Sequence, residues 1–129
     1  MVAMWSVNDS WYVRSRKSGC CEASLVISPE FQGTGIGREM ISLEMSIQVE
    51  LGYTRTINDF SASNERMRRL VRRLHGRRSV VIGCLPRGMY TAGVGWDDQV
   101  IVFQHLHDIR PFTEIAEHNR IYGVRSTKL

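Results

Sequence analysis

The chain of 129 residues is predicted to form one domain, 1–129, of the α/β class. Segments rich in β-branched and apolar residues alternate with segments whose apolar residues recur every three to four positions, as strands and helices do. Three alternating glycines, Gly33, Gly35 and Gly37, join the first clear strand to the first clear helix. Hydrophobic residues make up 43% of the chain, which is enough for a core, and no linker or repeat divides it.

The first half of the chain is expected to contain two strands and a long helix. Residues 11–16 form a short strand, and residues 23–28 form a buried strand that ends at Pro29, because proline cannot donate to a β-ladder. Gly52 is placed to end the helix in a left-handed conformation. The helix itself is predicted from one apolar stripe, made by Ile36, Met40, Leu43, Ile47 and Leu51.

The second half begins with a strand over residues 54–60, and Ser61-Ala62-Ser63-Asn64 then supplies N-cap chemistry for a second helix. Met67, Leu70, Val71 and Leu74 line one face of that helix, and Gly76 ends it. Residues 79–85 and 99–106 are predicted strands, joined by a turn-rich connection over 86–95. Residues 107–129 form a C-terminal extension, with a short helix near 112–119 and a basic tail.

The composition indicates a cytoplasmic protein with an anionic partner. The net charge of +4 suits nucleic acid or a cofactor with several phosphates. No apolar run approaches the roughly 20 residues that cross a bilayer, and no signal peptide is visible, so we expect no membrane contact. The three cysteines contain no Cys-x-x-Cys pair, and His105 and His107 are interpreted as satisfied strand histidines, so no metal site is expected.

The glycine loop predicts a phosphate-binding site. Glycines allow a sharp turn and close approach of a ligand, and their N–H groups point at one spot beside the positive end of a helix. Arg38 in the first turn is unfavourable for the helix unless an anion binds there. The alternative is a tight turn with glycines chosen only for their conformation. Gly37-Arg38-Glu39 does not fit a Walker loop, and Arg38 makes the dinucleotide fingerprint weak.

The segment Ile27-Ser28-Pro29-Glu30-Phe31-Gln32-Gly33-Thr34-Gly35-Ile36-Gly37-Arg38 resembles the acetyl-CoA motif of the GNAT N-acetyltransferases. That motif is a strand followed by Gln/Arg-x-x-Gly-x-Gly/Ala. Later segments are similar to the family in the same order, and the likeness covers residues 22–106. These segments are Glu50-Leu51-Gly52-Tyr53, Asn64-x-x-Met67-x-x-Leu70, Arg72-Arg73-Leu74, Gly83, Gly95-Trp96 and Asp98.

The resemblance implies a mixed, mostly antiparallel central sheet flanked by helices, with acetyl-CoA as co-substrate and no metal. It assigns the pantetheine arm to main-chain groups of Leu25, Val26 and Ile27, and to Asn64, which also reads as a plain N-cap. It assigns the pyrophosphate to the loop and the start of the helix, namely Gln32, Gly33, Thr34, Gly35, Ile36, Gly37 and Arg38.

The implied reaction is direct transfer of acetyl to a primary amine in a ternary complex, with N–H groups near Ile27 stabilising the oxyanion. Two positions depart from the family pattern. Val71 occupies the position of the tyrosine that protonates the leaving thiolate, and Cys21 that of the glutamate base. Glu22 is the candidate base, although its register places it on the opposite strand face unless a bulge intervenes.

Only about 22 residues precede the motif strand. The family's N-terminal helices, which wall the acceptor site, are therefore expected to be absent or supplied by a partner subunit, unless the chain is a fragment. The sheet edge this leaves favours a homodimer. Two further interpretations stay open. A non-catalytic acetyl-CoA binder is favoured by Val71 and Cys21, and a nucleic-acid-binding protein by seven arginines within residues 64–78, although no nucleic-acid motif accompanies them.

Overall fold

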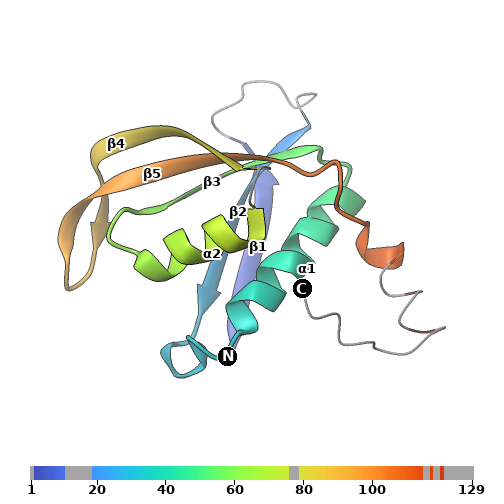
Figure 1. Ribbon diagram of the computed structural model, residues 1–129, viewed down its shortest axis with the longest axis horizontal. Coiled ribbons are helices and arrows are strands. Elements are labelled where there is room, and N and C mark those ends of the chain that lie inside the picture. The colour runs from blue at the N-terminus through green and yellow to red at the C-terminus, as the bar shows by residue number, and fades with distance from the viewer. Residues whose placement is uncertain (1, 11–18, 76–78, 115–116, 118–119, 121–129) are drawn as a thin grey trace.

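A computed structural model describes residues 2–10, 19–75, 79–114, 117 and 120. They form a five-stranded sheet in the order β1-β2-β3-β5-β4, and α1 and α2 lie together on one face of it (Figure 1). Only the β2–β3 pair is parallel among the strands described, so the sheet is mixed and mostly antiparallel, as expected. The elements are β1 (Ala3–Asp9), β2 (Cys20–Ile27), α1 (Ile36–Glu50), β3 (Arg55–Ser61), α2 (Glu65–His75), β4 (Ser79–Thr91) and β5 (Gly95–His105).

The two parallel strands at the centre of the sheet pair over a short stretch only. The last pair is Glu22 with Ile57, although β2 continues to Ile27 and β3 to Ser61. Beyond that pair, the Ala23 N–H donates to the Asn58 side-chain oxygen at 3.2 Å. β3 pairs with β5 along its whole length instead. The sheet therefore opens between β2 and β3 from Ala23 onward.

The core lies between α1 and the sheet. Ile41 and Met45 of α1 form a buried cluster with Leu106, and Leu25 of β2 and Leu70 of α2 pack against it. Both helices thus share one apolar layer over β2, which agrees with their position on a single face of the sheet.

The helix α1 has the predicted bounds to within one residue, but its buried face is not the predicted stripe. Leu51, in that stripe, is 61% exposed, and the other stripe residues are only half-buried. Gly52 ends the helix with φ of 88°, as expected of a left-handed cap. Three of the buried positions of the helix carry polar side chains, which the spacing of apolar residues does not reveal. The buried residues are Ile41, Glu44, Met45, Ser46 and Gln48.

The N-terminal strand differs from expectation. The predicted strand over 11–16 lies outside the described residues, whereas β1 at Ala3–Asp9 was not predicted. Its period-two signal is present, because half-buried Ala3, Trp5 and Val7 alternate with exposed neighbours. β2 also begins at Cys20, three residues before the predicted start.

The predicted connection over 86–95 is wrong. β4 continues to Thr91, and β5 begins at Gly95. The ladder absorbs Pro86 and Gly88 in an irregularity between Leu85 and Met89, where Arg87 has φ of 51° and its N–H donates to Asp98 at 2.9 Å. A bulge leaves residues out of the ladder, so turn-forming residues are tolerated there.

The second helix begins as predicted, because the Asn64 side-chain oxygen accepts the Met67 N–H at 3.0 Å. Asp97 of β5 braces this start by accepting from the Ser61 hydroxyl and from the Ser63 N–H. The Leu74 side chain and Gly76 lie outside the described residues. In the C-terminal extension residues 112–114, 117 and 120 are helical. No helix within the described part of the chain is long and apolar enough to cross a membrane.

Candidate functional site

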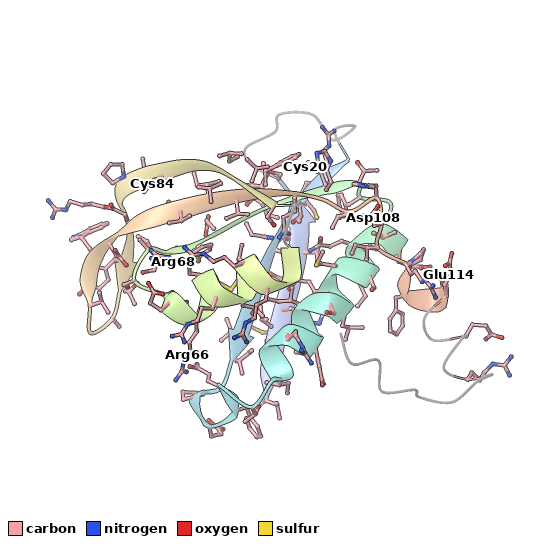
Figure 2. All side chains as sticks on the ribbon, viewed as in Figure 1. Cys20, Arg66, Arg68, Cys84, Asp108 and Glu114 are labelled. Atoms are coloured by element: carbon pink, nitrogen blue, oxygen red, sulfur yellow. The ribbon has the colours of Figure 1, made fainter. Side chains whose placement is uncertain are left out.

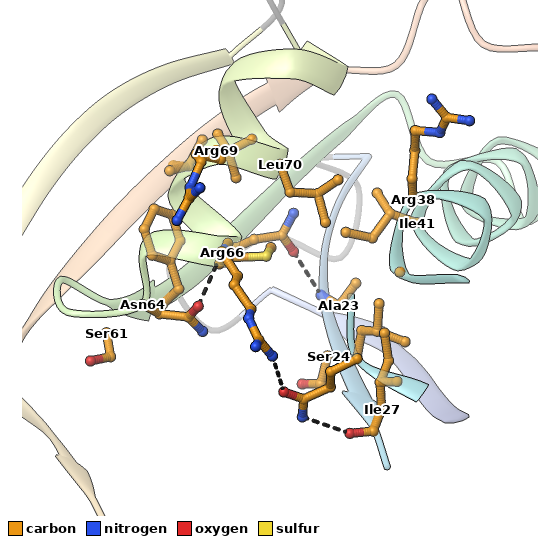
Figure 3. Close-up of a pocket in the computed structure, with 18 of the residues that line it drawn as sticks. Ala23, Ser24, Ile27, Arg38, Ile41, Ser61, Asn64, Arg66, Arg69 and Leu70 are labelled. Atoms are coloured by element: carbon orange, nitrogen blue, oxygen red, sulfur yellow. Dashed lines mark hydrogen bonds between the residues drawn. The ribbon is translucent and has the colours of Figure 1, made fainter. Parts of the chain in front are cut away.

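A large cleft opens between α1 and α2, over the separated ends of β2 and β3 (Figure 3). Its volume is about 1420 Å³, and its walls come from β2, the glycine loop, α1, α2 and β3, with further contributions from β4 and β5. Ordinary small-molecule pockets hold about 300–1,000 Å³. The cleft therefore has room for a ligand larger than a simple metabolite.

The glycine loop forms one end of the cleft. Gly33 and Gly35 have φ of 83° and 97°, a left-handed backbone that other residues rarely adopt. Gly35 is the N-cap of α1 and no side chain caps it. The Arg38 N–H donates to the Gly35 carbonyl at 3.1 Å, which leaves the N–H groups of Ile36 and Gly37 without an intrahelical partner. A Cβ at Gly37 would lie 3.1 Å from the Ile27 side chain. The absence of a side chain at Gly37 thus allows the start of the helix to lie against the end of β2.

Gln32 ties three elements together at this end. Its side-chain N–H donates to the Ile27 carbonyl at 3.1 Å, and its side-chain oxygen accepts from the Arg66 guanidinium at 2.8 Å (Figure 3). Arg66 reaches down from α2 toward the loop, as Figure 2 also shows. The end of β2, the loop and the start of α2 are therefore held as one unit.

Arginines concentrate positive charge beside the loop. Arg66, Arg69 and Arg73 share one face of α2 and line the cleft, together with Arg38 of α1. Arg68 points elsewhere and donates to the Ala62 carbonyl and to Glu65, whereas Arg77 and Arg78 lie outside the described residues. Guanidinium groups next to an uncapped helix N-terminus suit a ligand with several phosphates.

The backbone of β2 offers alternate residues to the cleft. The Ser28 N–H donates to Val2 at 3.0 Å, so even-numbered residues face β1, whereas the Ala23 N–H points toward β3. The main-chain groups of Leu25 and Ile27 therefore face the opening between β2 and β3. Those of Val26 face β1, and its side chain is 55% exposed on the opposite face of the sheet.

At the inner end of the cleft lies Glu44, a residue that the sequence did not single out. Its side chain lines the cleft although the residue is only 5% exposed. Burial raises the pKa of Glu44 to about 7, against the opposing effect of a 3.0 Å hydrogen bond donated by Gln48. The side-chain amide oxygen of Gln48 is buried and has no hydrogen-bond partner among the described residues.

Neutral side chains of the sheet surround this inner end. Burial also raises the pKa of the Cys21 thiol, to about 11, so Cys21 stays protonated. Asn58 donates to Gln104 at 3.5 Å, and Gln104 donates to Ser79 at 2.9 Å. In the sequence, this cluster is indicated only by Glu44 and Gln48, which stand four residues apart on a helix that packs against a sheet and can therefore contact each other.

Most of the predicted cofactor residues line one cleft: Leu25, Ile27, Gln32, Gly33, Thr34, Gly35, Gly37, Arg38 and Asn64. Val26, Ile36 and Glu22 are not among the lining residues. The Glu22 carboxylate accepts from the Ser10 hydroxyl at 2.8 Å, on the face of the sheet opposite Leu25. Val71, at the position of the family's acid, does line the cleft. No cluster of three or more potential metal ligands occurs within the described ranges.

No protein-family model matches the sequence, and no curated protein matches it. Solved structures do match. A GCN5-related N-acetyltransferase from Kribbella flavida has a TM-score of 0.67 at 15% identity, over 81% of this chain and 60% of its own. The ribosomal-protein-S5-alanine acetyltransferase of Vibrio fischeri has a TM-score of 0.67 at 18% identity, over 85% and 57%. The yncA protein of Salmonella typhimurium, described as an acetyltransferase and solved with its cofactor acetyl-CoA, has a TM-score of 0.68 at 23% identity, over 81% and 58%.

These similarities establish the fold alone, because identities of 15–23% do not by themselves carry an activity from one protein to another. The chain spans between 57% and 60% of the length of these three structures.

Proposed function

The chain has the fold of the GNAT N-acetyltransferases, and on that premise we propose that its cleft binds acetyl-CoA as a co-substrate. One observation carries the proposal: the uncapped, glycine-rich start of α1 and four arginines line the same cleft. Three phosphate groups of the cofactor need N–H donors and positive charge at one end of a long groove. Gly33 to Gly37 supply the donors, and Arg38, Arg66, Arg69 and Arg73 supply the charge.

The opening between β2 and β3 accommodates the pantetheine arm in this proposal. The arm carries amide groups, and the main-chain groups of Leu25 and Ile27 face the opening. Asn64 lines the same cleft but already accepts the Met67 N–H, so its amide nitrogen is the group left for the arm. Support for Val26 as a binding residue is weaker, because its backbone faces β1.

The proposed reaction is acetyl transfer to a primary amine by direct attack in a ternary complex. The amine attacks as the neutral base, and Glu22 is the predicted acceptor of its proton. Because Glu22 lies on the face of the sheet opposite the cleft, this role requires the amine to approach the thioester from that face, through the opening between β2 and β3. The Leu25 N–H, which faces the opening between the strands, donates to the thioester oxygen as negative charge develops on it. The alternative is a chain that binds acetyl-CoA without turnover, which Val71 and Cys21 favour.

The binding proposal is tested by calorimetric titration with acetyl-CoA of the wild type and of Gly35→Glu. The variant places a carboxylate at the helix N-terminus and strains a backbone with φ of 97°. Gly93→Glu is a matched control, because Gly93 has φ of 80° and equally open surroundings, in the turn between β4 and β5. We expect binding that Gly35→Glu abolishes and Gly93→Glu preserves. No binding by a folded wild type rejects the proposal.

A second titration separates the cofactor from nucleic acid. Arg66→Ala removes a guanidinium of the cleft, whereas Arg110→Ala removes one that lies outside it. We expect acetyl-CoA affinity to fall by about tenfold or more in Arg66→Ala only, because a hydrogen bond to a charged group contributes about 1.5–3 kcal/mol. Salt-sensitive DNA binding without acetyl-CoA binding would favour the nucleic-acid interpretation. Acetyl-CoA binding without turnover on primary amines would favour the non-catalytic one.

A further inference from the structure

The proposed reaction releases a thiolate, and a proton donor in the cleft would stabilise it as the carbon–sulfur bond breaks. Val71 of α2 lines the cleft but carries no proton donor. Cys21 has a pKa raised to about 11, above that of an ordinary thiol, so it is a poor acid for this step. Among the described residues, two acidic side chains line the cleft. Asp59 of β3 is exposed and accepts from Gln99 at 2.7 Å, whereas Glu44 of α1 is buried at the inner end.

The position of Glu44 matches the reach of the cofactor, because α1 returns along β2. At the start of the helix, Gly37 lies against Ile27. One turn later Ile41 and Met45 pack near Leu25, and the charge of Glu44 contributes to the raised pKa of Cys21. Eight residues separate Ile36 from Glu44, roughly 12 Å along a helix axis.

The same distance is obtained along the strand. Four residues separate Ile27 from Ala23, roughly 13 Å along a strand. An extended pantetheine arm is comparable in length to about four residues, roughly 13 Å. If the pyrophosphate of acetyl-CoA lies at the glycine loop, its thioester therefore lies between Ala23 and Glu44.

We propose that Glu44 is the general acid of this cleft and protonates the sulfur of the leaving coenzyme A. This inference rests on the acetyl-CoA function proposed above. The amine nitrogen forms a bond to the carbonyl carbon, the carbon–sulfur bond breaks, and sulfur keeps its electron pair. The Glu44 carboxyl O–H gives its proton to that sulfur and is left as carboxylate. The proton lost by the amine passes to its base, which releases it to solvent, and Glu44 regains one proton from solvent, so that the cycle is balanced.

The surroundings keep Glu44 able to donate near neutral pH. From β2, Cys21 faces it as a neutral thiol, and the β3 and β5 side chains on that face, Thr56, Asn58 and Gln104, do not titrate. From α2, the charged side chains that line this side of the cleft are Arg69 and Arg73. With burial raising its pKa to about 7, Glu44 is about half protonated at pH 7, where an ordinary glutamate is fully ionised.

The test compares acetyl transfer by wild type, Glu44→Gln and Glu39→Gln, with spermidine and an alanine-initiated peptide as acceptors. Glu39 lies on the same helix, exposed and outside the cleft lining, so Glu39→Gln is the matched control. We expect kcat of Glu44→Gln to fall about 100-fold at pH 6, because a positioned acid contributes about 10²–10⁴-fold. The deficit should shrink as pH rises through 7 toward 9, because wild-type Glu44 loses its proton over that range.

A purely structural role for Glu44 would give a deficit that does not change with pH, and that result overturns the inference. A Glu44→Gln variant with wild-type kcat also overturns it, as does acetyl-CoA binding by the wild type without turnover on either acceptor. Failure of the wild type to bind acetyl-CoA in the titration above removes the proposed function itself, so the two failures are distinguishable.

A readout without turnover uses carbon-13 NMR of glutamate carboxyl groups. One resonance should titrate near pH 7 in the wild type and in Glu39→Gln, and it should be missing from Glu44→Gln. All glutamates titrating in the ordinary range near pH 4.3 would overturn the inference as well.

Discussion

At the scale of single residues, Glu44 places an ionisable group where the core needs an apolar one. Its pKa is raised from 4.5 to about 7, so between these values the folded chain binds more protons than the unfolded chain. The stability that the protonated form provides is full below about pH 4.5 and is lost as pH rises through about 7. A shift of this size corresponds to about 3 kcal/mol in the free energy of unfolding.

Replacing Glu44 with glutamine removes this pH dependence. We expect the free energy of unfolding of Glu44→Gln, relative to wild type, to increase by about 3 kcal/mol between pH 4.5 and pH 8. Urea denaturation at both pH values measures it, and Glu39→Gln on the exposed face of α1 should show no such change. A constant difference between Glu44→Gln and wild type would mean that Glu44 has the same pKa in the folded and the unfolded chain.

The residues of the site differ in how far they can be predicted from sequence. Gly33, Gly35 and Arg38 carry a local signal, because positive φ and a misplaced cation are properties of a few neighbouring positions. Glu44 carries no such signal, since its burial and its pKa depend on which face of α1 packs against the sheet. Val26 shows the same limit, because the side to which its backbone points depends on pairing with β1.

At the scale of elements, the start of α2 depends on one side chain that has two proposed roles. The Asn64 oxygen accepts the Met67 N–H, and the loss of such a cap costs about 1 kcal/mol. We expect Asn64→Ala to lower the unfolding free energy by that amount, whereas Asn64→Asp keeps the acceptor oxygen and therefore most of the stability. Thermal denaturation of the two variants checks this.

Acetyl-CoA titration of the same variants separates the cap from the cofactor role. Asn64→Asp removes the amide nitrogen while keeping the cap, so weaker binding in that variant supports contact with the pantetheine arm. If Asn64→Asp binds like wild type, Asn64 acts only as a cap.

Element prediction failed where tertiary pairing overrides local chemistry. Pro86 and Gly88 have the residue types of a turn, yet the pairing of β4 with β5 continues on both sides of them. The helices and β3 were predictable because periodicity, caps and Gly52 are all local. A bulge is decided by the partner strand, and β5 lies beyond the segment from which the turn was predicted.

At the scale of the whole molecule, the order of strands follows from the likeness to a known fold rather than from local pattern. The parallel contact between β2 and β3, and its end at Glu22 and Ile57, are long-range features. Alternation of strands and helices predicted only the α/β class. The opening that creates the cleft became predictable only through the residues from Ile27 to Arg38 that resemble the GNAT motif.

Of the two outer strands of the sheet, β1 and β4, it is β4 from which we predict self-association. β4 ends the strand order, and its exposed apolar side chains include Val81 at 63% and Tyr90 at 66% exposure. A long apolar edge strand can pair with its own copy about a two-fold axis, because antiparallel pairing of identical edges is self-complementary. We therefore predict a homodimer, measured by sedimentation velocity. Val81→Lys should shift it to monomer by placing charge on the edge, whereas Val94→Lys, at 60% exposure in the turn beyond β4, should not. A monomeric wild type, or a dimer that Val94→Lys disrupts and Val81→Lys does not, excludes association through this edge.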